Sequence, residues 1–119
     1  MGEQLAPYGT DLDFLIQQRL GRRIGVDDAA AAVHWVFANI ADYGGSPERI
    51  FLTGHSAGAY LAAMVGLDKR WLAKYGADAD KLAGIIPLSA QVITHLTIRQ
   101  ERGIPPKTAV IDEFAPIYH

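Results

Sequence analysis

The spacing of apolar residues predicts two helices in the first third of the chain. Over residues 10–20, apolar side chains recur at helical spacing behind a possible cap at Thr10: Leu12, Leu15, Ile16 and Leu20. The second helix has a clearer apolar face: Ala29, Val33, Val36, Phe37 and Ile40. Gly44 and Gly45 end it. Trp35 falls on the opposite side of this helix, which predicts a second covered surface.

The stretch from Ile50 to Gly66 predicts a short buried strand that leads directly into a buried helix. Residues 50–53 are mostly apolar and residues 57–66 are small or apolar. Between them stands the pattern Gly54-x-Ser56-x-Gly58. A serine at so tight a turn takes a strained backbone conformation that exposes its hydroxyl, and we expect that neither flanking glycine can be replaced by a bulkier residue. We therefore predict a nucleophile elbow; the alternative is a glycine-rich turn with a bystander serine.

A second strand is predicted over residues 82–89, which are short, apolar and preceded by a helix. Pro87 is unusual there, because proline removes a ladder donor and is tolerated mainly at edges, strand ends or bulges. Strand, helix and strand without a hairpin signal predict a parallel β-α-β unit with a right-handed crossover. We expect residues 68–72 to be an exposed continuation of the elbow helix. Past Ser89 the pattern predicts a polar, partly helical segment and one helical turn over residues 109–114.

Composition narrows the classes of function. With 119 residues, half of them hydrophobic and 20% charged, the chain is one globular domain at most. The net charge is −2 and the basic residues form no stripe beyond Arg22-Arg23, so nucleic acid is not an expected partner. No cysteine is present, which excludes disulfides and thiolate metal sites. No apolar run approaches the roughly 18 residues of a membrane span. The default expectation is a soluble cytoplasmic protein with no membrane partner, although a signal on a missing N-terminus stays an alternative.

Several short blocks occur in a fixed order around Gly54-His55-Ser56-Ala57-Gly58. They are Asp28-Ala29-Ala30, Trp35-Val36, Asn39-Ile40, Tyr43-Gly44-Gly45, Pro47, Arg49-Ile50, Leu88-Ser89, Ile111-Asp112 and Ala115-Pro116. In this order they resemble the α/β-hydrolase superfamily, and above all its carboxylesterase branch akin to hormone-sensitive lipase and kynurenine formamidase. The resemblance implies a partial α/β-hydrolase domain over residues 1–119 with an incomplete sheet. Residues 26–119 are its central part, with the elbow at 54–58, and residues 1–24 match poorly.

Carried over by position, the resemblance implies that Ser56 is the acylated nucleophile. It also implies that the backbone N–H of Ala57 is one donor of the oxyanion hole. His55 belongs to the motif, but we expect it to pack or hydrogen-bond beside the turn and not to catalyse. The implied activity is hydrolysis of small carboxylic esters through an acyl-enzyme, with aryl formamides or acetylated sugars as alternatives. No metal or organic cofactor is implied.

The catalytic partners of Ser56 are not visible in the sequence. No His-Gly-Gly loop precedes it, and the triad acid and histidine should follow at the ends of further strands. Asp112 or Glu113 with His119 has the right order, but five or six residues between them are too few for the strands and helix that normally intervene. We favour a cap or salt-bridge role for Asp112. His95 follows the second strand on the side of the sheet where ligands bind, so it is either a pocket residue or a solvated loop histidine.

Two classes of function remain open. The first is the nucleophile-bearing part of a serine esterase, and the second is a hydrolase-like binding protein that keeps the elbow without catalysis. Without a base the Ser56 hydroxyl stays protonated at neutral pH, so we predict negligible esterase activity for this chain alone. Two short strands cannot cover an elbow helix that is apolar all round, so the uncovered sheet and helix surface is expected to permit self-association.

Overall fold

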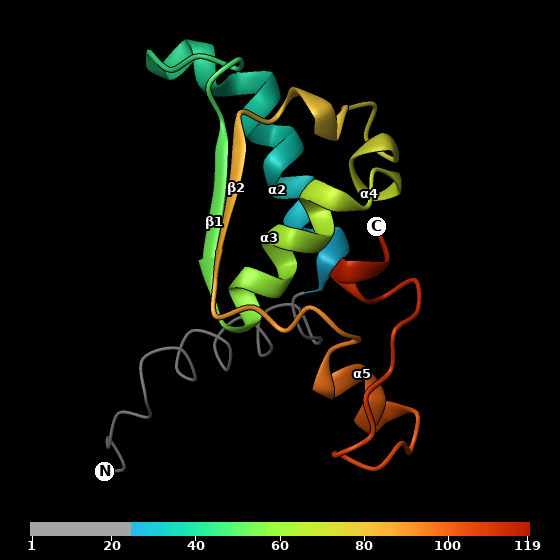
Figure 1. Ribbon diagram of the computed structural model, residues 1–119. Coiled ribbons are helices and arrows are strands. Elements are labelled where there is room, and N and C mark those ends of the chain that lie inside the picture. The colour runs from blue at the N-terminus through green and yellow to red at the C-terminus, as the bar shows by residue number, and fades with distance from the viewer. Residues whose placement is uncertain (1–24) are drawn as a thin grey trace, which may run out of the picture.

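The computed structural model describes residues 25–119 (Figure 1). The helix expected over residues 10–20 and the Arg22-Arg23 pair lie outside this range. In chain order the elements are α2 (Val26–Asn39), the 3₁₀ turn η1 (Ile40–Tyr43), β1 (Phe51–His55), α3 (Ala57–Leu67), α4 (Arg70–Ala73), η2 (Ala79–Lys81), β2 (Gly84–Leu88), α5 (Leu96–Glu101) and η3 (Pro116–Tyr118). The predicted sequence of helix, strand, helix and strand is therefore confirmed from α2 to β2.

The two strands form a parallel pair that α3 connects. Phe51 lies opposite Gly84 at one end of the register and His55 lies opposite Leu88 at the other. The predicted parallel β-α-β unit is confirmed. Pro87 lies inside β2, which has β1 as its single neighbour within residues 25–119. This edge position explains why the missing amide donor of Pro87 is tolerated.

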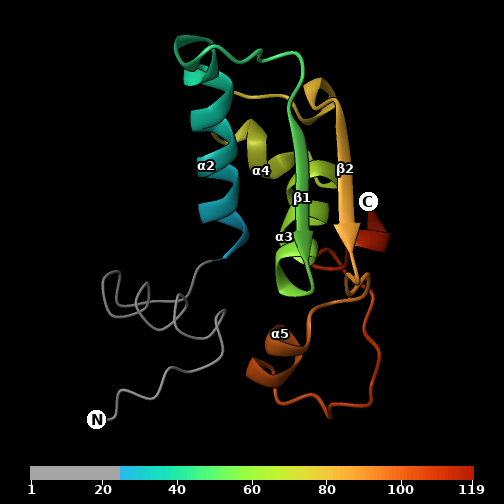
Figure 2. The same cartoon turned by 90° about the vertical axis from the view of Figure 1, so that its left-hand side faces the viewer.

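The helices cover one face of this small sheet (Figures 1 and 2). α3 contacts both strands, and α2 packs against α3 and α4. The largest fully buried apolar side chains, Met64, Val65 and Leu72, lie on α3 and α4. Because α3 is enclosed on most sides, nearly its whole length is apolar or small. A Cβ atom at Gly66 would overlap the side chain of Ile85, so the helix lies directly on β2.

The opposite face of the sheet is bare among the described residues. Phe51, Ile86 and Leu88 are 58%, 51% and 52% exposed. Side chains alternate along a strand, so these three point away from the helices. We call this surface the bare sheet face; it is the uncovered surface that the sequence predicts. None of the helices in the described part of the chain is long and apolar enough to cross a membrane.

Three details of the pattern were wrong. Trp35 is 51% exposed and its ring lies against Tyr43, so the described residues do not cover a second surface of α2. Residues 68–72 are not wholly exposed, because Asp68 and Leu72 are buried and α4 packs on α2. The helical turn near the C-terminus is η3, which begins at Pro116 and not within 109–114; proline is favoured in the first turn of a helix.

Candidate active site

Ser56 stands at the corner between β1 and α3, with φ 55° and ψ −115°. For a residue with a side chain this conformation costs about 1–3 kcal/mol and persists only where its surroundings enforce it. Two backbone hydrogen bonds hold the corner. The Ser56 N–H donates to the carbonyl of Leu88 (2.9 Å), and the Tyr60 N–H donates to the carbonyl of Ser56 (3.0 Å). The predicted strand-to-helix corner is therefore confirmed.

The two glycines of the motif have different reasons to be there. A Cβ atom at Gly54 would lie 2.5 Å from the carbonyl carbon and oxygen of Gly58 and 2.9 Å from the nitrogen of Ala59. Backbone cannot yield as a flexible side chain can, so glycine is required at position 54. A Cβ at Gly58 would meet no atom of residues 25–119 within 4 Å. The expectation that both positions must lack bulk is right for Gly54 and wrong for Gly58.

The corner presents a hydroxyl and an amide that the described residues leave unpartnered. Ser56 is exposed, and although it occupies the N-cap position of α3, its side chain makes no capping hydrogen bond. The Ala57 N–H is in the first turn of α3, where no intrahelical acceptor exists, and no group of residues 25–119 accepts it. The helix N-terminus adds partial positive charge. Negative charge that develops on an oxygen next to Ser56 would be stabilised there.

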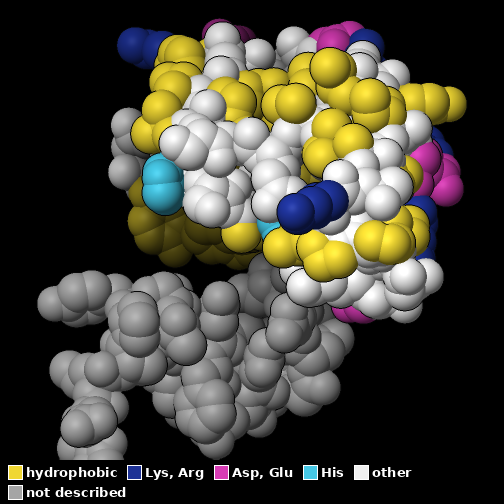
Figure 3. Space-filling model, turned by 60° about the horizontal axis from the view of Figure 1, so that its bottom comes forward, with side chains coloured by type: hydrophobic (Ala, Val, Ile, Leu, Met, Phe, Trp, Pro, Cys, Tyr) yellow, Lys and Arg dark blue, Asp and Glu magenta, His cyan; other side chains and the backbone are white. Residues whose placement is uncertain are grey.

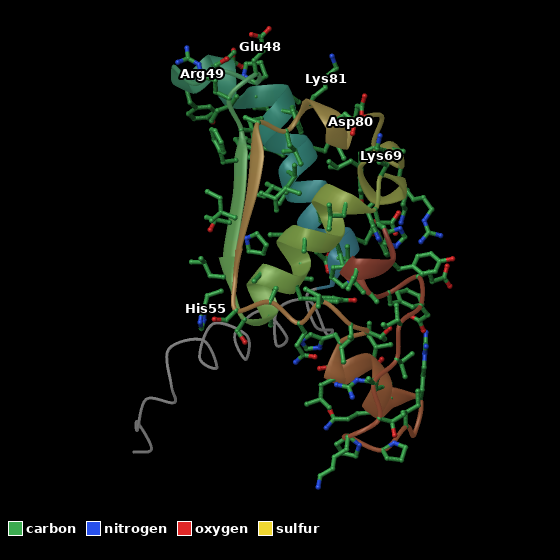
Figure 4. The ribbon with its side chains drawn as sticks, viewed as in Figure 1. Glu48, Arg49, His55, Lys69, Asp80 and Lys81 are labelled. Atoms are coloured by element: carbon green, nitrogen blue, oxygen red, sulfur yellow. The ribbon has the colours of Figure 1, made fainter. Side chains whose placement is uncertain are left out.

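His55 follows the alternation of β1 and lies on the bare sheet face. It is exposed, and in Figure 4 it points away from the helices at the end of the strand. The described residues give its side chain no hydrogen bond beside the turn, because it lies on the face that the helices do not cover.

His119 lies at the far end of α3 from Ser56. Its Nε2 is 3.4 Å from Oδ2 of Asp68 and 2.9 Å from the carbonyl oxygen of Glu113. Asp68 is the C-cap of α3 and Ser56 is its N-cap, and the 11 residues between them span about 16 Å. The described structure therefore does not bring His119 to Ser56.

Asp112 is held as an anchor of the C-terminal segment. Its carboxylate accepts hydrogen bonds from the Thr94 hydroxyl (2.6 Å) and the Phe114 N–H (2.9 Å), and it pairs with Arg102 at 2.6 Å. The Thr94 hydroxyl and the Arg102 guanidinium hold the pKa of Asp112 below its ordinary value. No histidine is among these partners. In residues 25–119, histidines and carboxylates form no group of three that could hold a metal ion.

His95 approaches the first turns of α3 from the segment after β2. Its ring centroid lies 4.9 Å from that of Tyr60, which is one helical turn after Ser56. Its Nδ1 accepts a hydrogen bond from the Thr97 N–H at 3.2 Å. In a triad, this nitrogen would donate to a carboxylate, so the described partners of His95 differ from those of a triad base. Burial and the neighbouring Arg99 lower the pKa of His95.

Sequence reasoning missed Tyr60 and Arg99. The Tyr60 hydroxyl donates to the carbonyl of Phe114, and burial raises its pKa to about 12. Arg99 is 6% exposed, with its guanidinium donating to the carbonyls of Thr94, Pro106 and Thr108. Tyr60 lies four residues after Ser56, which is one helical turn, and this spacing was the only feature of the sequence that could have identified it. Every residue has a backbone carbonyl, so the hydrogen bonds of Arg99 could not be predicted from the sequence.

The family model described as the carboxylesterase family matches residues 17–116 of this chain. The chain belongs to the carboxylesterase family. With the small parallel sheet and its covering helices, this supports a fragment of the α/β-hydrolase fold, as the order of residue blocks predicts. No solved structure matches the chain.

Curated relatives match over parts of their length. Carboxylesterase NlhH of Mycobacterium tuberculosis is 34% identical over 93 residues, which are 78% of this chain and 25% of that protein. Esterase LipQ of the same organism is 58% identical over 40 residues, 34% of this chain and 10% of that protein. The probable isoprenylcysteine alpha-carbonyl methylesterase ICMEL1 of Oryza sativa subsp. japonica is 58% identical over 38 residues, 32% and 9% of the two chains. The matched part of this chain spans a quarter or less of each of these relatives.

Proposed function

We propose that Ser56 is the nucleophile of a carboxylic ester hydrolase and that the Ala57 N–H is one donor to its oxyanion. The observation that carries this proposal is the φ of 55° at Ser56, at a corner where the hydroxyl is exposed and makes no capping bond. The hydrogen bonds from the Ser56 N–H to Leu88 and from the Tyr60 N–H to Ser56 hold that conformation. Membership of the carboxylesterase family supports small-molecule esters as the substrates. Aryl formamides and acetylated sugars stay alternative substrates.

The proposed reaction has two steps. Oγ of Ser56 attacks the ester carbonyl carbon, its proton passes to a base, and the negative charge on the carbonyl oxygen is stabilised by the Ala57 N–H. The carbon–oxygen bond to the alcohol then breaks, and the alcohol leaves with a proton returned by the base. In the second step water attacks the acyl-enzyme, which releases the carboxylic acid and restores the serine. No described histidine forms a hydrogen bond with Ser56, so we assign the base, the acid and the remaining oxyanion donors to parts of the intact enzyme outside residues 25–119.

Exogenous imidazole tests this proposal, because it can supply the missing base. We expect the chain alone to show negligible hydrolysis of a short-chain nitrophenyl ester and no labelling of Ser56 by a fluorophosphonate. With nitrophenyl acetate and imidazole, peptide mass spectrometry should find one acetyl group on Ser56. Ser56→Ala should remove that adduct, and Ser89→Ala should keep it. Ser89 is the matched control, because it has the same φ of 55° after β2.

Two results would contradict the assignment. Acetylation confined to surface amines, unchanged in Ser56→Ala, would favour the alternative of a hydrolase-like binding protein without catalysis. A burst of nitrophenol without imidazole that vanishes in Ser56→Ala would show instead that this chain contains its own base. In that case Asp112 and His119 would return as the candidate triad partners.

We also propose that two copies associate through the bare sheet face. A parallel sheet is ordinarily covered on both faces, and one patch on each copy can pair with itself about a twofold axis. Phe51, Ile86 and Leu88 supply that patch. Sedimentation equilibrium should show a mass that rises with concentration, and Ile86→Lys should reduce the rise. A chain that stays monomeric at all concentrations would contradict this.

A further inference from the structure

The segment after β2 lies at the end of the molecule where the proposed nucleophile stands. Figures 1 and 2 both place α5 beyond the ends of the two strands, and Figure 3 turns this end toward the viewer. The chain leaves β2 at Leu88, whose carbonyl accepts the Ser56 N–H. Six residues after Ser89 the chain reaches His95, which contacts Tyr60 on the first turns of α3. Long helical side chains lean toward the N-terminus of their helix, so the Tyr60–His95 contact lies at the Ser56 end of α3.

The hydrogen bonds of His95 fix which nitrogen carries its proton. Nδ1 accepts from the Thr97 N–H, so in the neutral ring the proton is on Nε2. No hydrogen bond within residues 25–119 uses Nε2, and the residue as a whole is only half-buried. Burial and Arg99 lower the pKa of His95, which favours the uncharged ring. His95 therefore offers one uncommitted, uncharged donor beside the corner.

The surroundings of His95 hold this donor in place. Its ring lies against Tyr60, and the Tyr60 hydroxyl is fixed by the carbonyl of Phe114. The preceding residue, Thr94, is fully buried; its carbonyl accepts from Arg99 and its hydroxyl donates to Asp112. A donor whose own supports are satisfied loses little conformational freedom when it binds a ligand.

We propose that His95 is a specificity-determining residue that donates Nε2–H to an oxygen of the substrate other than those of the scissile ester. The site would then favour uncharged esters that carry a hydroxyl or second carbonyl over alkyl esters of the same size. The apolar side chain of Val92, in the segment between β2 and His95, is 48% exposed and suits the remaining hydrocarbon. This inference rests on the proposed role of Ser56, because the donor is useful only if the ester binds at the corner.

The test compares two esters that differ by one hydroxyl, ethyl 3-hydroxybutanoate and ethyl butanoate. They are titrated into the Ser56→Ala chain with ¹⁵N-labelled histidine, so that binding is read without hydrolysis. We expect the hydroxy ester to shift the Nε2 resonance of His95 and to bind roughly three- to tenfold more tightly, the value of one neutral hydrogen bond. Ethyl butanoate should leave that resonance unchanged.

Matched variants separate the donor from the structural roles of the ring. His95→Asn keeps an N-cap for α5 but shortens the reach, and His95→Phe keeps the ring against Tyr60 without a donor. Both should abolish the preference for the hydroxy ester. His34→Phe is the control, because His34 also stacks on a tyrosine, Tyr75, but lies on α2. It should keep the preference.

Each outcome decides a separate point. Equal affinity for the two esters, no binding of either, or a preference that survives both His95 variants would overturn the role of His95. Acetylation of Ser56 in the imidazole assay together with equal affinities would overturn that role alone. A preference that depends on His95, without acetylation of Ser56, would overturn the proposed hydrolase function and leave an ester-binding site at the corner.

Discussion

The polar groups at the two ends of α3 differ in whether they have hydrogen-bond partners. At the N-terminal end, Ser56 is strained and exposed, and neither its hydroxyl nor the Ala57 N–H has a partner among the described residues. At the C-terminal end, the Asp68 carboxylate is 2% exposed and accepts three hydrogen bonds from Arg70. Polar groups that stabilise a fold are ordinarily satisfied. Unsatisfied and strained groups on an otherwise consistent structure are expected at functional sites, which supports the proposed role of the Ser56 end.

The C-terminal segment contacts both ends of this helix. Phe114 accepts the Tyr60 hydroxyl near the N-terminal end, and His119 approaches Asp68 at the C-terminal end. Arg70 adds a contact of 3.3 Å to Glu113. The segment thus stabilises α3 along its length while it leaves the corner open.

The largest effect is expected from the strained end. Gly54→Ala should cost about 3 kcal/mol or more of unfolding free energy, because its Cβ would overlap the backbone of Gly58. Gly58→Ala is the control and should raise stability by about 0.5–1 kcal/mol, since alanine is favoured over glycine inside a helix. Urea unfolding of the two variants measures the difference. Equal stabilities would mean that the corner is looser than the structure shows.

The next largest effect on stability is expected at the C-terminal end of α3, where the polar groups are satisfied. Asp68→Asn should cost about 1.5–3 kcal/mol, because it weakens charged hydrogen bonds to Arg70 around a buried side chain. Asp80→Asn is the matched control: Asp80 pairs with Lys69 through side chains that are more than half exposed, as Figure 4 shows at the surface. It should have no measurable effect. A loss in both variants, or in neither, would remove the contrast between the two ends.

Lowering the pH should reduce the unfolding free energy through Asp68 at the C-terminal end of α3. Hydrogen bonds from Arg70 hold the pKa of Asp68 below its ordinary value of 3.8. The stabilisation is therefore complete above that value and is lost as the pH falls through the lower, folded pKa. Unfolding free energy measured from pH 7 to 2 should fall below about pH 4, and less steeply in Asp68→Asn. Asp27 and Asp112 have lowered pKa values too, so the slope should shrink without vanishing. An unchanged slope would contradict this.

The smallest effect is expected from relief of strain at Ser56. Ser56→Gly removes the Cβ atom that disfavours a φ of 55°, at the cost of greater freedom in the unfolded chain. The net change should be a gain of about 1 kcal/mol, seen as a higher midpoint of thermal unfolding. Ser89→Gly should shift the midpoint in the same direction. A loss of stability in Ser56→Gly would show that the serine side chain supports the corner.

The elements that sequence predicts well are those set by neighbours in the chain. The corner at Ser56 follows from a short apolar strand, a glycine and a helix of small residues, all within 17 positions. The errors concern contacts between distant residues. Whether Gly58 must lack bulk, whether Trp35 is covered and whether Leu72 is buried depend on what packs against each, and periodicity does not encode that.

The same distinction holds for the candidate site. Ser56 and Ala57 were identified from a local motif, and His95 from its place after a strand. The contact of His95 with Tyr60 joins residues 35 positions apart, and Arg99 fixes its loop through backbone carbonyls that any sequence would offer. Side-chain identity alone therefore predicted where a ligand could approach but not how the residues there are supported.

Because the Ser56 N–H donates to Leu88, two adjacent amides should exchange their protons at different rates. The Ser56 N–H is enclosed in the junction of the two strands, whereas the next amide along the chain, at Ala57, meets only solvent among the described residues. Deuterium should replace the first proton slowly and the second within the dead time of the measurement. An anion bound at the corner should slow exchange of the Ala57 amide and leave that of the Ser56 amide unchanged. The ratio of the two exchange rates would therefore report whether the corner is occupied.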